Sequence, residues 1–229
     1  MNVAIIAGAG QGTRFGGKRA KQFRELAGIP IIIHTLKRFE QSASIGEIIV
    51  VVPAGDVPGF LQLAGKFKLG KLARVVAGGA TRMESVFRGL QAVRAATAEI
   101  IAVHDGVRPF VSTDEIDRTM QAAREVGAAI LAAPASDTIK EVREGRVGRT
   151  LLRAETWHAL TPQCFRYDIL RRAYERALAE TVVEATDDSQ LVERLGLPVA
   201  VVEGDPRNIK ITRPEDIALA EILLREVEM

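Results

Sequence analysis

The sequence has little of what marks cross-linked, zinc-binding or membrane-spanning proteins. Cys164 is the single cysteine among 229 residues, which excludes an internal disulfide and a Cys-rich metal site. Only three histidines are present, none of them in a His-x-x-x-His pair, so a zinc centre is not expected. No apolar run approaches the ~20 residues that a membrane-spanning helix needs. The first residues enter a strand pattern without a basic segment or a cleavage site, and we therefore expect a cytoplasmic protein.

Neither sign of charge dominates the sequence. Lys and Arg number 31 and Asp and Glu number 29, a formal net charge of +2. This balance indicates neither nucleic acid nor a membrane as a partner. Hydrophobic residues make up 47% and charged residues 26%, the proportions of a globular protein rather than a disordered, collagen-like or disulfide-scaffold chain. Because no repeat, low-complexity segment or linker is found, we expect a single domain over residues 1–229.

Short apolar runs rich in β-branched residues recur along the chain, with helical patterns between them. The runs do not alternate with polar residues, which is typical of strands buried on both faces of a parallel sheet. Two of the helical segments begin with the spacing of a capping box, at Ser112 and at Thr212. Strands that alternate with helices predict an α/β fold with a doubly wound, mostly parallel sheet. The expected strands are residues 3–6, 48–52, 73–76, 100–103, 128–132 and 199–202.

One stretch, at about residues 134–156, breaks this alternation. Its pattern predicts a β-hairpin that is polar on one face and turns around Gly145. A hairpin inserted into an α/β fold must pack somewhere, and a partner subunit is a natural place for it. The alternative is a flap in solvent, and the periodicity alone does not choose between the two.

A glycine-rich loop follows the first expected strand. In an α/β sheet this loop lies at the carboxyl edge, where ligands bind. Glycines at alternate positions let backbone N–H groups approach an anion closely, and basic residues supply its countercharge. The loop therefore indicates a polyphosphate site, with a plain tight turn as the alternative. The loop glycines are Gly8, Gly10 and Gly12, and the basic residues are Arg14, Lys18, Arg19 and Lys21.

Two known phosphate motifs nearly match this loop and fail. The dinucleotide fingerprint requires a small residue where Thr13 stands and an acid after the second strand, where the chain has Pro53. The Walker motif requires Ser or Thr where Arg19 stands. The sequence therefore supports neither a nicotinamide cofactor nor a P-loop.

Polar residues gather near three further expected strands. Asp105, at the end of a central strand, is placed to hold magnesium or to orient a substrate hydroxyl, and Arg108 either clamps a phosphate or pairs with Asp105. The segment 78–82 opens a helix, and its amides with Ser85 are placed to read the edge of a base, although it is also an ordinary helix start. Lys210 is either a solvated strand residue or a further cation for a polyphosphate.

Together these motifs closely resemble the 2-C-methyl-D-erythritol 4-phosphate cytidylyltransferase family of the non-mevalonate isoprenoid pathway. The resemblance covers nearly the whole chain and implies a nucleotidyltransferase α/β fold of Rossmann-like type, in which the inserted hairpin arm embraces the second subunit of a homodimer. The matching segments are the glycine loop through Arg14, Lys21-Gln22, residues 78–82 with Ser85-Val86, His104-Asp105 with Arg108-Pro109, residues 137–140, Arg153, residues 161–163, residues 186–188 and residues 208–212.

The resemblance also implies a reaction and a role for each matching residue. The phosphate of methylerythritol 4-phosphate attacks the α-phosphorus of CTP in line and releases pyrophosphate. Magnesium is held mainly by the CTP phosphates, with Asp105 as a possible ligand. Catalytic roles fall to Arg14, Lys21 and Lys210. Nucleotide binding falls to Gly8, Ala9, Gly10, Gly12, Gly79, Ala80 and Ser85. Binding of the polyol phosphate falls to Asp105, Arg108, Thr138 and Arg153, the last two on the arm.

Two alternatives to this function remain open. A ribitol 5-phosphate cytidylyltransferase has a related sequence and the same chemistry, and only the acceptor alcohol separates the two. A non-catalytic nucleotide-binding module would bind CTP without releasing pyrophosphate, which would leave Lys210 and Arg153 without a task.

Overall fold

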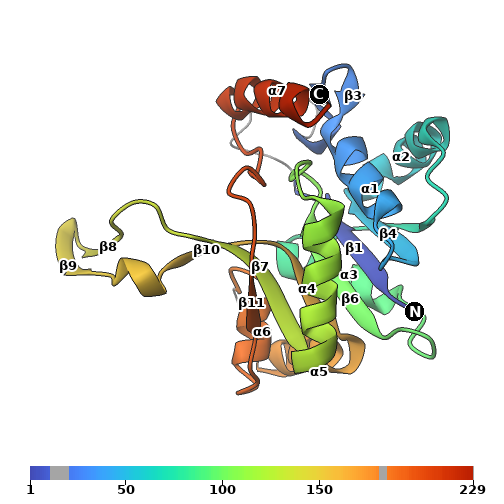
Figure 1. The fold of residues 1–229 in the computed structure, drawn as a ribbon. Helices are drawn as coiled ribbons and strands as arrows, with labels where there is room; N and C mark the ends of the chain where they lie inside the picture. Colours follow the sequence, from blue (N-terminus) through green and yellow to red (C-terminus); the bar gives the residue numbers. More distant parts are fainter. Residues whose placement is uncertain (11–20, 181–184, 229) are drawn as a thin grey trace.

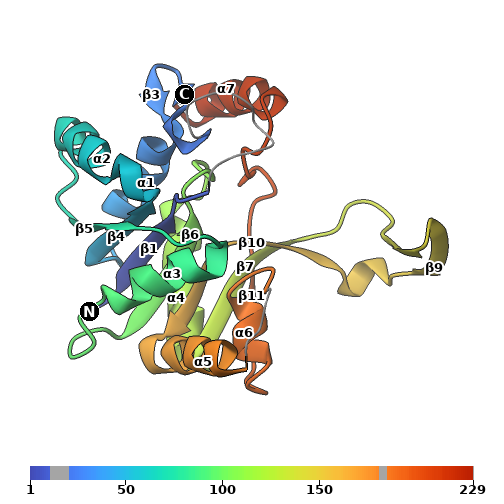
Figure 2. The same ribbon diagram turned by 180° about the vertical axis from the view of Figure 1, so that it is seen from behind.

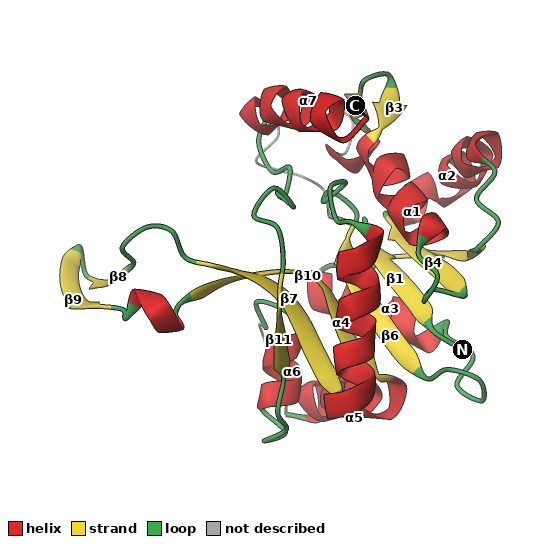
Figure 3. Cartoon of the chain, viewed as in Figure 1, coloured by secondary structure: helices red, strands yellow, loops and turns green. Residues whose placement is uncertain are grey.

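A seven-stranded sheet forms the centre of the molecule and has helices on both faces (Figures 1 and 3). The computed structural model describes residues 1–10, 21–180 and 185–228. The strands lie in the order β11-β7-β10-β6-β1-β4-β5, and all neighbours are parallel except at β10. The predicted doubly wound, mostly parallel α/β fold is confirmed. The strands are β1 (Val3–Ala7), β4 (Glu47–Val52), β5 (Leu72–Ala77), β6 (Ile100–Asp105), β7 (Ala128–Pro134), β10 (Trp157–Arg166) and β11 (Ala200–Glu203).

Strand β10 is absent from the expected strands, and it runs antiparallel to both of its neighbours, β6 and β7. Its sequence contains Pro162, and a proline normally argues against a strand inside a sheet because it cannot donate to the ladder. The ladder with β7 changes register between Ala159 and Gln163, so the proline lies where the regular pairing is interrupted. The irregularity thus allows a proline in an interior strand.

The expectation that every strand is buried on both faces is wrong for the two edge strands. Strand β5 is mostly half-buried, and Val201 of β11 is 53% exposed. Each of these strands has a neighbour on one side only, so its apolar residues remain partly open to solvent.

Helices cover the two faces of the sheet in separate groups (Figure 2). One face carries α1 (Ile31–Gln41), α2 (Val57–Ala64) and α4 (Thr113–Val126), and the other carries α3 (Arg82–Gln91), α5 (Tyr167–Ala179) and α6 (Ser189–Glu193). A last helix, α7 (Glu215–Glu228), packs near the small hairpin of β2 (Glu25–Leu26) and β3 (Ile29–Pro30). None of the described helices is long and apolar enough to cross a bilayer.

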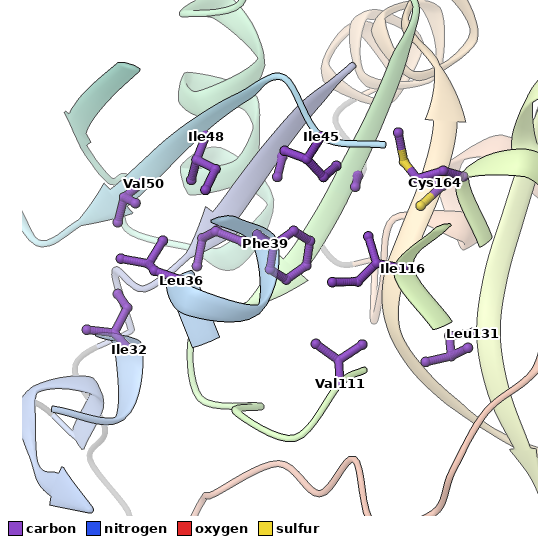
Figure 4. Close-up of a cluster of buried hydrophobic side chains, with 14 of the residues drawn as sticks. Ile32, Leu36, Phe39, Ile45, Ile48, Val50, Val111, Ile116, Leu131 and Cys164 are labelled. Atoms are coloured by element: carbon purple, nitrogen blue, oxygen red, sulfur yellow. The ribbon is translucent and has the colours of Figure 1, made fainter. Parts of the chain in front are cut away.

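Residues that alternate along each inner strand pack into two hydrophobic clusters. In β1, Ala4 and Ile6 join the cluster under α1, α2 and α4, whereas Val3 and Ile5 join the opposite cluster. Figure 4 shows the first cluster, in which Phe39 and its neighbours on α1 face β4. Each fully buried aliphatic side chain of this kind contributes about 1.5–3 kcal/mol of transfer free energy. Burial on both faces explains why the inner strands have continuous apolar sequences.

The two expected capping boxes have different outcomes. At α4 the box is confirmed, since the Glu115 amide donates to Ser112 Oγ at 3.1 Å and the Ser112 amide donates to Glu115 Oε2 at 2.8 Å. At α7 the expected acid, Glu215, is the wrong one. The carboxylate of Asp216 instead accepts from the amides of Thr212 and Arg213 at 2.7 and 2.8 Å, because the helix begins only at Glu215.

The predicted hairpin is confirmed as β8 (Lys140–Arg143) and β9 (Arg146–Thr150), which turn through Glu144 and Gly145 at positive φ. It projects well away from the sheet (Figures 1 and 2). We refer to residues 134–156 as the arm. The hairpin strands are exposed on both faces, and Val142 and Val147 are 58% and 62% exposed. The two hairpin strands therefore belong to none of the hydrophobic clusters of the described residues.

Candidate active site

A cavity of about 410 Å³ opens where β1, β4, β5 and β6 reach their carboxyl ends. Parallel strands place this edge of the sheet, and the loops that follow each strand form the walls. The cavity brings together predicted residues from four segments that are distant in sequence. They are Gly8, Ala9, Gly10, Gly79, Ala80, Ser85, Asp105 and Lys210.

Asp105 is the charged centre of this cavity. Lys210 Nζ lies 2.8 Å from Asp105 Oδ2, Arg108 Nε lies 3.4 Å from the same oxygen, and Arg82 Nε lies 3.5 Å from Oδ1. Burial works against the ionised carboxylate, but these three cations hold the pKa of Asp105 well below its usual range. The arrangement keeps several cations beside the cavity, where a polyanionic ligand can replace Asp105 as their ion-pair partner.

Arg108 takes the second of its two predicted roles in this structure. Besides its ion pair with Asp105, its Nη1 donates to the carbonyl oxygen of Asn208 at 2.7 Å. Burial lowers the pKa of Arg108, although Asp105 opposes the shift. Arg108 is not among the residues that line the cavity, so phosphate binding by its side chain stays a prediction.

The glycines of the two loops serve close packing as well as ligand access. The Gly8 amide donates to the Val51 carbonyl at 2.8 Å, so this N–H group is already used in a backbone hydrogen bond. A Cβ on Gly8 would lie 2.8 Å from Ile32 Cδ1, and a Cβ on Gly78 would lie 2.2 Å from the Cβ of Ala9. A Cβ on Gly10, in contrast, would meet no atom of the described residues within 4 Å. Among the described residues, the start of this loop is therefore tightly packed at Gly8 but not at Gly10.

The start of α3 holds the amides that are predicted to read a base. The Gly79 amide donates to Ser85 Oγ at 3.1 Å, and the Ala80 amide donates to Glu84 Oε2 at 2.7 Å. Thr81 caps the helix by accepting from the Glu84 amide at 3.0 Å. Both amides thus point into the α3 turn, where a base edge has to compete with the side chains of Ser85 and Glu84.

His104 has no role in the sequence prediction, yet it fixes the turn that carries Asp105 and Arg108. Its ring is fully buried, with Nε2 3.0 Å from the Arg108 carbonyl and Nδ1 3.0 Å from Thr161 Oγ1. Thr161 Oγ1 in turn accepts from the Asp105 amide at 3.3 Å. Burial lowers the pKa of His104 to about 4, so the ring is neutral at pH 7. A neutral ring that donates from Nε2 accepts the Thr161 hydroxyl at Nδ1.

Arg82 lines the cavity and also has no predicted role. Its Nη2 lies 2.7 Å from Oδ2 of Asp188, which is buried behind the cavity wall. Burial disfavours the charged guanidinium, but Asp188 and Asp105 raise the pKa of Arg82 above its ordinary value. The sequence signal for this pair was the match of residues 186–188 to the family pattern, which names the positions but not their partner.

Besides Arg108, five predicted site residues lie outside the cavity or have side chains outside the described part of the chain. Thr138 and Arg153 are exposed on the arm and do not line the cavity. Gly12 and Arg14 fall outside the described residues. Lys21 begins a 3-10 helix, Lys21–Phe23, but its side chain is also outside the described part.

The described residues offer a magnesium ion few ligands. Nowhere among them do three His, Cys, Asp or Glu side chains gather as a metal site. Asp105 is the acidic residue among those that line the cavity, and both of its oxygens already face cations. Asp105 therefore suits a cluster of Lys and Arg side chains better than a metal ion held by the protein alone.

Comparison with known proteins identifies the family. Residues 2–226 match the family 2-C-methyl-D-erythritol 4-phosphate cytidylyltransferase. The protein of that name from Geobacter metallireducens is 45% identical over 226 residues, which cover 97% of this chain and 97% of that protein. The one from Syntrophus aciditrophicus is 44% identical and covers 99% of this chain and 97% of that protein.

Solved structures agree. A 4-diphosphocytidyl-2C-methyl-D-erythritol synthase from Anaerococcus prevotii superposes with a TM-score of 0.87 at 34% identity, covering 98% of this chain and 96% of that chain. A 2-C-methyl-D-erythritol 4-phosphate cytidylyltransferase from Thermus thermophilus gives a TM-score of 0.78 at 36% identity, covering 97% and 98%. The chain belongs to the 2-C-methyl-D-erythritol 4-phosphate cytidylyltransferase family.

Proposed function

We propose that this protein transfers the cytidylyl group of CTP to 2-C-methyl-D-erythritol 4-phosphate, giving 4-diphosphocytidyl-2-C-methyl-D-erythritol and pyrophosphate. One observation carries the proposal besides family membership. The cation cluster around Asp105 lies in the same cavity as the two glycine-rich loops, which is the arrangement that a nucleoside triphosphate and a second phosphate require.

The reaction needs no covalent intermediate on the protein. A phosphate oxygen of the acceptor attacks the α-phosphorus of CTP and forms a new P–O bond, while the bond to the β-phosphate breaks and pyrophosphate leaves. Negative charge accumulates on the phosphoryl oxygens during this exchange. Lys210 lies in the cavity and is placed to neutralise that charge, and Arg14 and Lys21 are proposed to do the same from the glycine loop.

Asp105 serves the acceptor in this scheme. When phosphates draw Lys210 away from Asp105, the carboxylate oxygen gains room to accept a hydrogen bond from an acceptor hydroxyl. This exchange of partners also suits a cavity with more cations than carboxylates. The cations pair with Asp105 before the substrates bind and with substrate phosphates afterwards.

We propose that magnesium enters with CTP, held mainly by the phosphate oxygens. When bound, it neutralises charge on the triphosphate. This agrees with the few carboxylates that the cavity offers.

We also propose a cytoplasmic location, which a single buried and unpaired cysteine, Cys164, supports.

We propose further that the arm binds a second copy of the chain and forms a homodimer. Val142, Val147 and Leu152 expose apolar side chains there, at 58%, 62% and 63%. Thr138 and Arg153, which the family pattern assigns to the acceptor phosphate, lie on this arm and away from the cavity of their own chain. If the arm binds a partner, its apolar side chains are covered by the partner, and Thr138 and Arg153 reach the partner's cavity.

The proposed function is tested by measuring pyrophosphate release with CTP and magnesium. Methylerythritol 4-phosphate is expected to support release, and ribitol 5-phosphate at the same concentration is expected not to. Release with ribitol 5-phosphate alone would contradict the proposed acceptor. Binding of CTP without release from either acceptor would instead indicate a non-catalytic nucleotide-binding module.

A further inference from the structure

Arg82 occupies a position that needs explanation. It is the first residue of α3, where the partial positive charge of the helix terminus disfavours a cation. Two carboxylates compensate for this, one on each side of the guanidinium. Asp188 lies 2.7 Å from Nη2, whereas the cavity carboxylate of Asp105 lies 3.5 Å from Nε. The closer contact is therefore with the carboxylate that faces the protein interior.

Asp188 is in turn held from the interior by two other elements. Its side chain is 1% exposed, and its Oδ1 accepts from the hydroxyl of Tyr174 on α5 at 2.5 Å. The Tyr174 ring is fully buried and stacks on Phe87 of α3 with centroids 5.7 Å apart. Gln163 of β10 fixes the backbone, since its Oε1 accepts from the amide of Asp188 at 3.0 Å. Asp188 thus has little freedom to follow Arg82 if the latter moves.

We propose that Tyr174 and Asp188 are positioning residues for the acceptor substrate, which set Arg82 and, through it, the orientation of the Asp105 carboxylate. This inference rests on the proposed function, in which Asp105 receives the acceptor hydroxyls. The contacts form one chain from the interior to the cavity, Tyr174 to Asp188 to Arg82 to Asp105. A carboxylate with three cations around it takes a different orientation when one of them shifts, and an acceptor hydroxyl then loses its hydrogen-bond geometry.

The test begins with Tyr174→Phe, which removes only the hydroxyl that orients Asp188. Loss of one buried hydrogen bond in this series of contacts is expected to raise the KM for methylerythritol 4-phosphate about threefold to tenfold. The KM for CTP and kcat are expected to change less. Asp188→Asn, a second variant of nearly equal size, is expected to shift the same constant in the same direction, because Arg82 loses its closer charged partner.

Positioning through Arg82 makes a prediction that a purely structural role does not make. In an Arg82→Gln background, Tyr174→Phe is expected to leave the acceptor KM where Arg82→Gln alone puts it. The matched control is Thr119→Val, which removes a fully buried hydroxyl on α4 that is bonded to the Glu115 carbonyl. It is expected to lower the melting temperature without changing either KM.

The possible outcomes separate this inference from the proposed function. A wild-type protein that releases no pyrophosphate overturns both. An active wild type with an unchanged acceptor KM in Tyr174→Phe and Asp188→Asn overturns the positioning role alone. The same holds if the Tyr174→Phe effect is equally large in the Arg82→Gln background, or if Thr119→Val shifts the acceptor KM as much as Tyr174→Phe does.

Discussion

Lys210 reaches the cavity from the segment between β11 and α7, and its side chain is 37% exposed while its ammonium group pairs with Asp105 at 2.8 Å. An exposed cation in this place is free to exchange Asp105 for a phosphate. Lys210→Ala is therefore expected to lower kcat by about 10²–10³, the scale of losing one contact to charge that develops in a transition state. Initial rates of pyrophosphate release at saturating CTP measure this. The control is Lys66→Ala, an exposed lysine away from the cavity, and a near-normal kcat in Lys210→Ala would contradict the role.

His104 makes a prediction about stability rather than turnover. Burial lowers its pKa from 6.5 to about 4, so the unfolded chain takes up a proton more readily than the folded one. The contribution of His104 to the free energy of unfolding has its full value above pH 6.5. It falls as the pH drops from 6.5 towards 4, by about 3 kcal/mol in total. Asp105 contributes in the same direction only at lower pH, below the usual carboxyl pKa, because its own pKa is lowered.

Urea unfolding of the wild type and of His104→Gln between pH 7.5 and 4.5 tests this linkage. The wild type is expected to lose more free energy of unfolding across this range than the variant does, because glutamine does not titrate. The variant starts from a lower stability, since it loses the ring contact with Phe39, so the comparison concerns the slope and not the absolute value. Equal slopes for the two proteins would show that His104 does not carry the effect.

At the scale of single residues, the sequence predicts those whose role depends on a single strand end or loop. Asp105 and Lys210 are of this kind, and the structure places both in the cavity. Arg82 and Asp188 were missed because their pairing joins positions 106 residues apart, which only the packing of α3 against the segment before α6 brings together. The roles of Arg14 and Lys21 stay predictions.

At the scale of elements, the loops after β1 and β5 are packed so closely that they act as one wall of the cavity. A Cβ on Gly78 would lie 2.2 Å from the Cβ of Ala9 and 2.9 Å from Ser85 Oγ. Gly78→Ala is therefore expected to separate the loops and to destabilise the protein by about 1–3 kcal/mol. The control is Gly55→Ala, where a Cβ meets nothing within 4 Å. Thermal unfolding of both variants measures the difference, and equal melting temperatures would argue against close packing.

Element prediction succeeded where one local pattern decides the structure. The inner parallel strands and the capping box at Ser112 are examples, because burial on both faces and the cap are visible in short windows of sequence. It failed at β10, because Pro162 makes the local sequence unlike a strand, while pairing with β6 and β7 holds the segment in the sheet. It also misjudged β5 and β11, because the order of strands in the sheet decides which of them lie at the edges.

At the scale of the whole molecule, the arm raises the question of where a complete acceptor site is formed. Arg153 lies in the short 3-10 helix Arg153–Glu155 on the arm and does not line the cavity of its own chain. Arg153→Ala is expected to raise the KM for methylerythritol 4-phosphate by about tenfold to a hundredfold, the scale of one lost charge-assisted hydrogen bond, while the KM for CTP changes little. Arg146→Ala, an exposed arginine near the hairpin turn, is the control, and an unchanged acceptor KM in Arg153→Ala would remove this residue from the site.

If a partner's arm completes each site, two impaired variants restore activity together. In a dimer of one Lys210→Ala chain and one Arg153→Ala chain, one site combines an intact Lys210 with an intact Arg153, and the other site lacks both. Random exchange of equal amounts makes half of the dimers hybrid, so about a quarter of all sites regain wild-type composition. Pyrophosphate release at an acceptor concentration below the KM of Arg153→Ala measures this, with hybrid formation verified by native mass spectrometry.

The arrangement of the sites decides the result of that mixing. When each arm serves the cavity of its own chain, no hybrid contains an intact site, and verified hybrids show no gain over the unmixed variants. A mixture of Lys210→Ala with the double variant Lys210→Ala/Arg153→Ala controls for stabilisation by mixing alone, because neither chain then supplies Lys210. Recovery towards a quarter of the wild-type rate in the first mixture and none in the second requires that the arm, whose hairpin strands are exposed, reaches the cavity of a second chain.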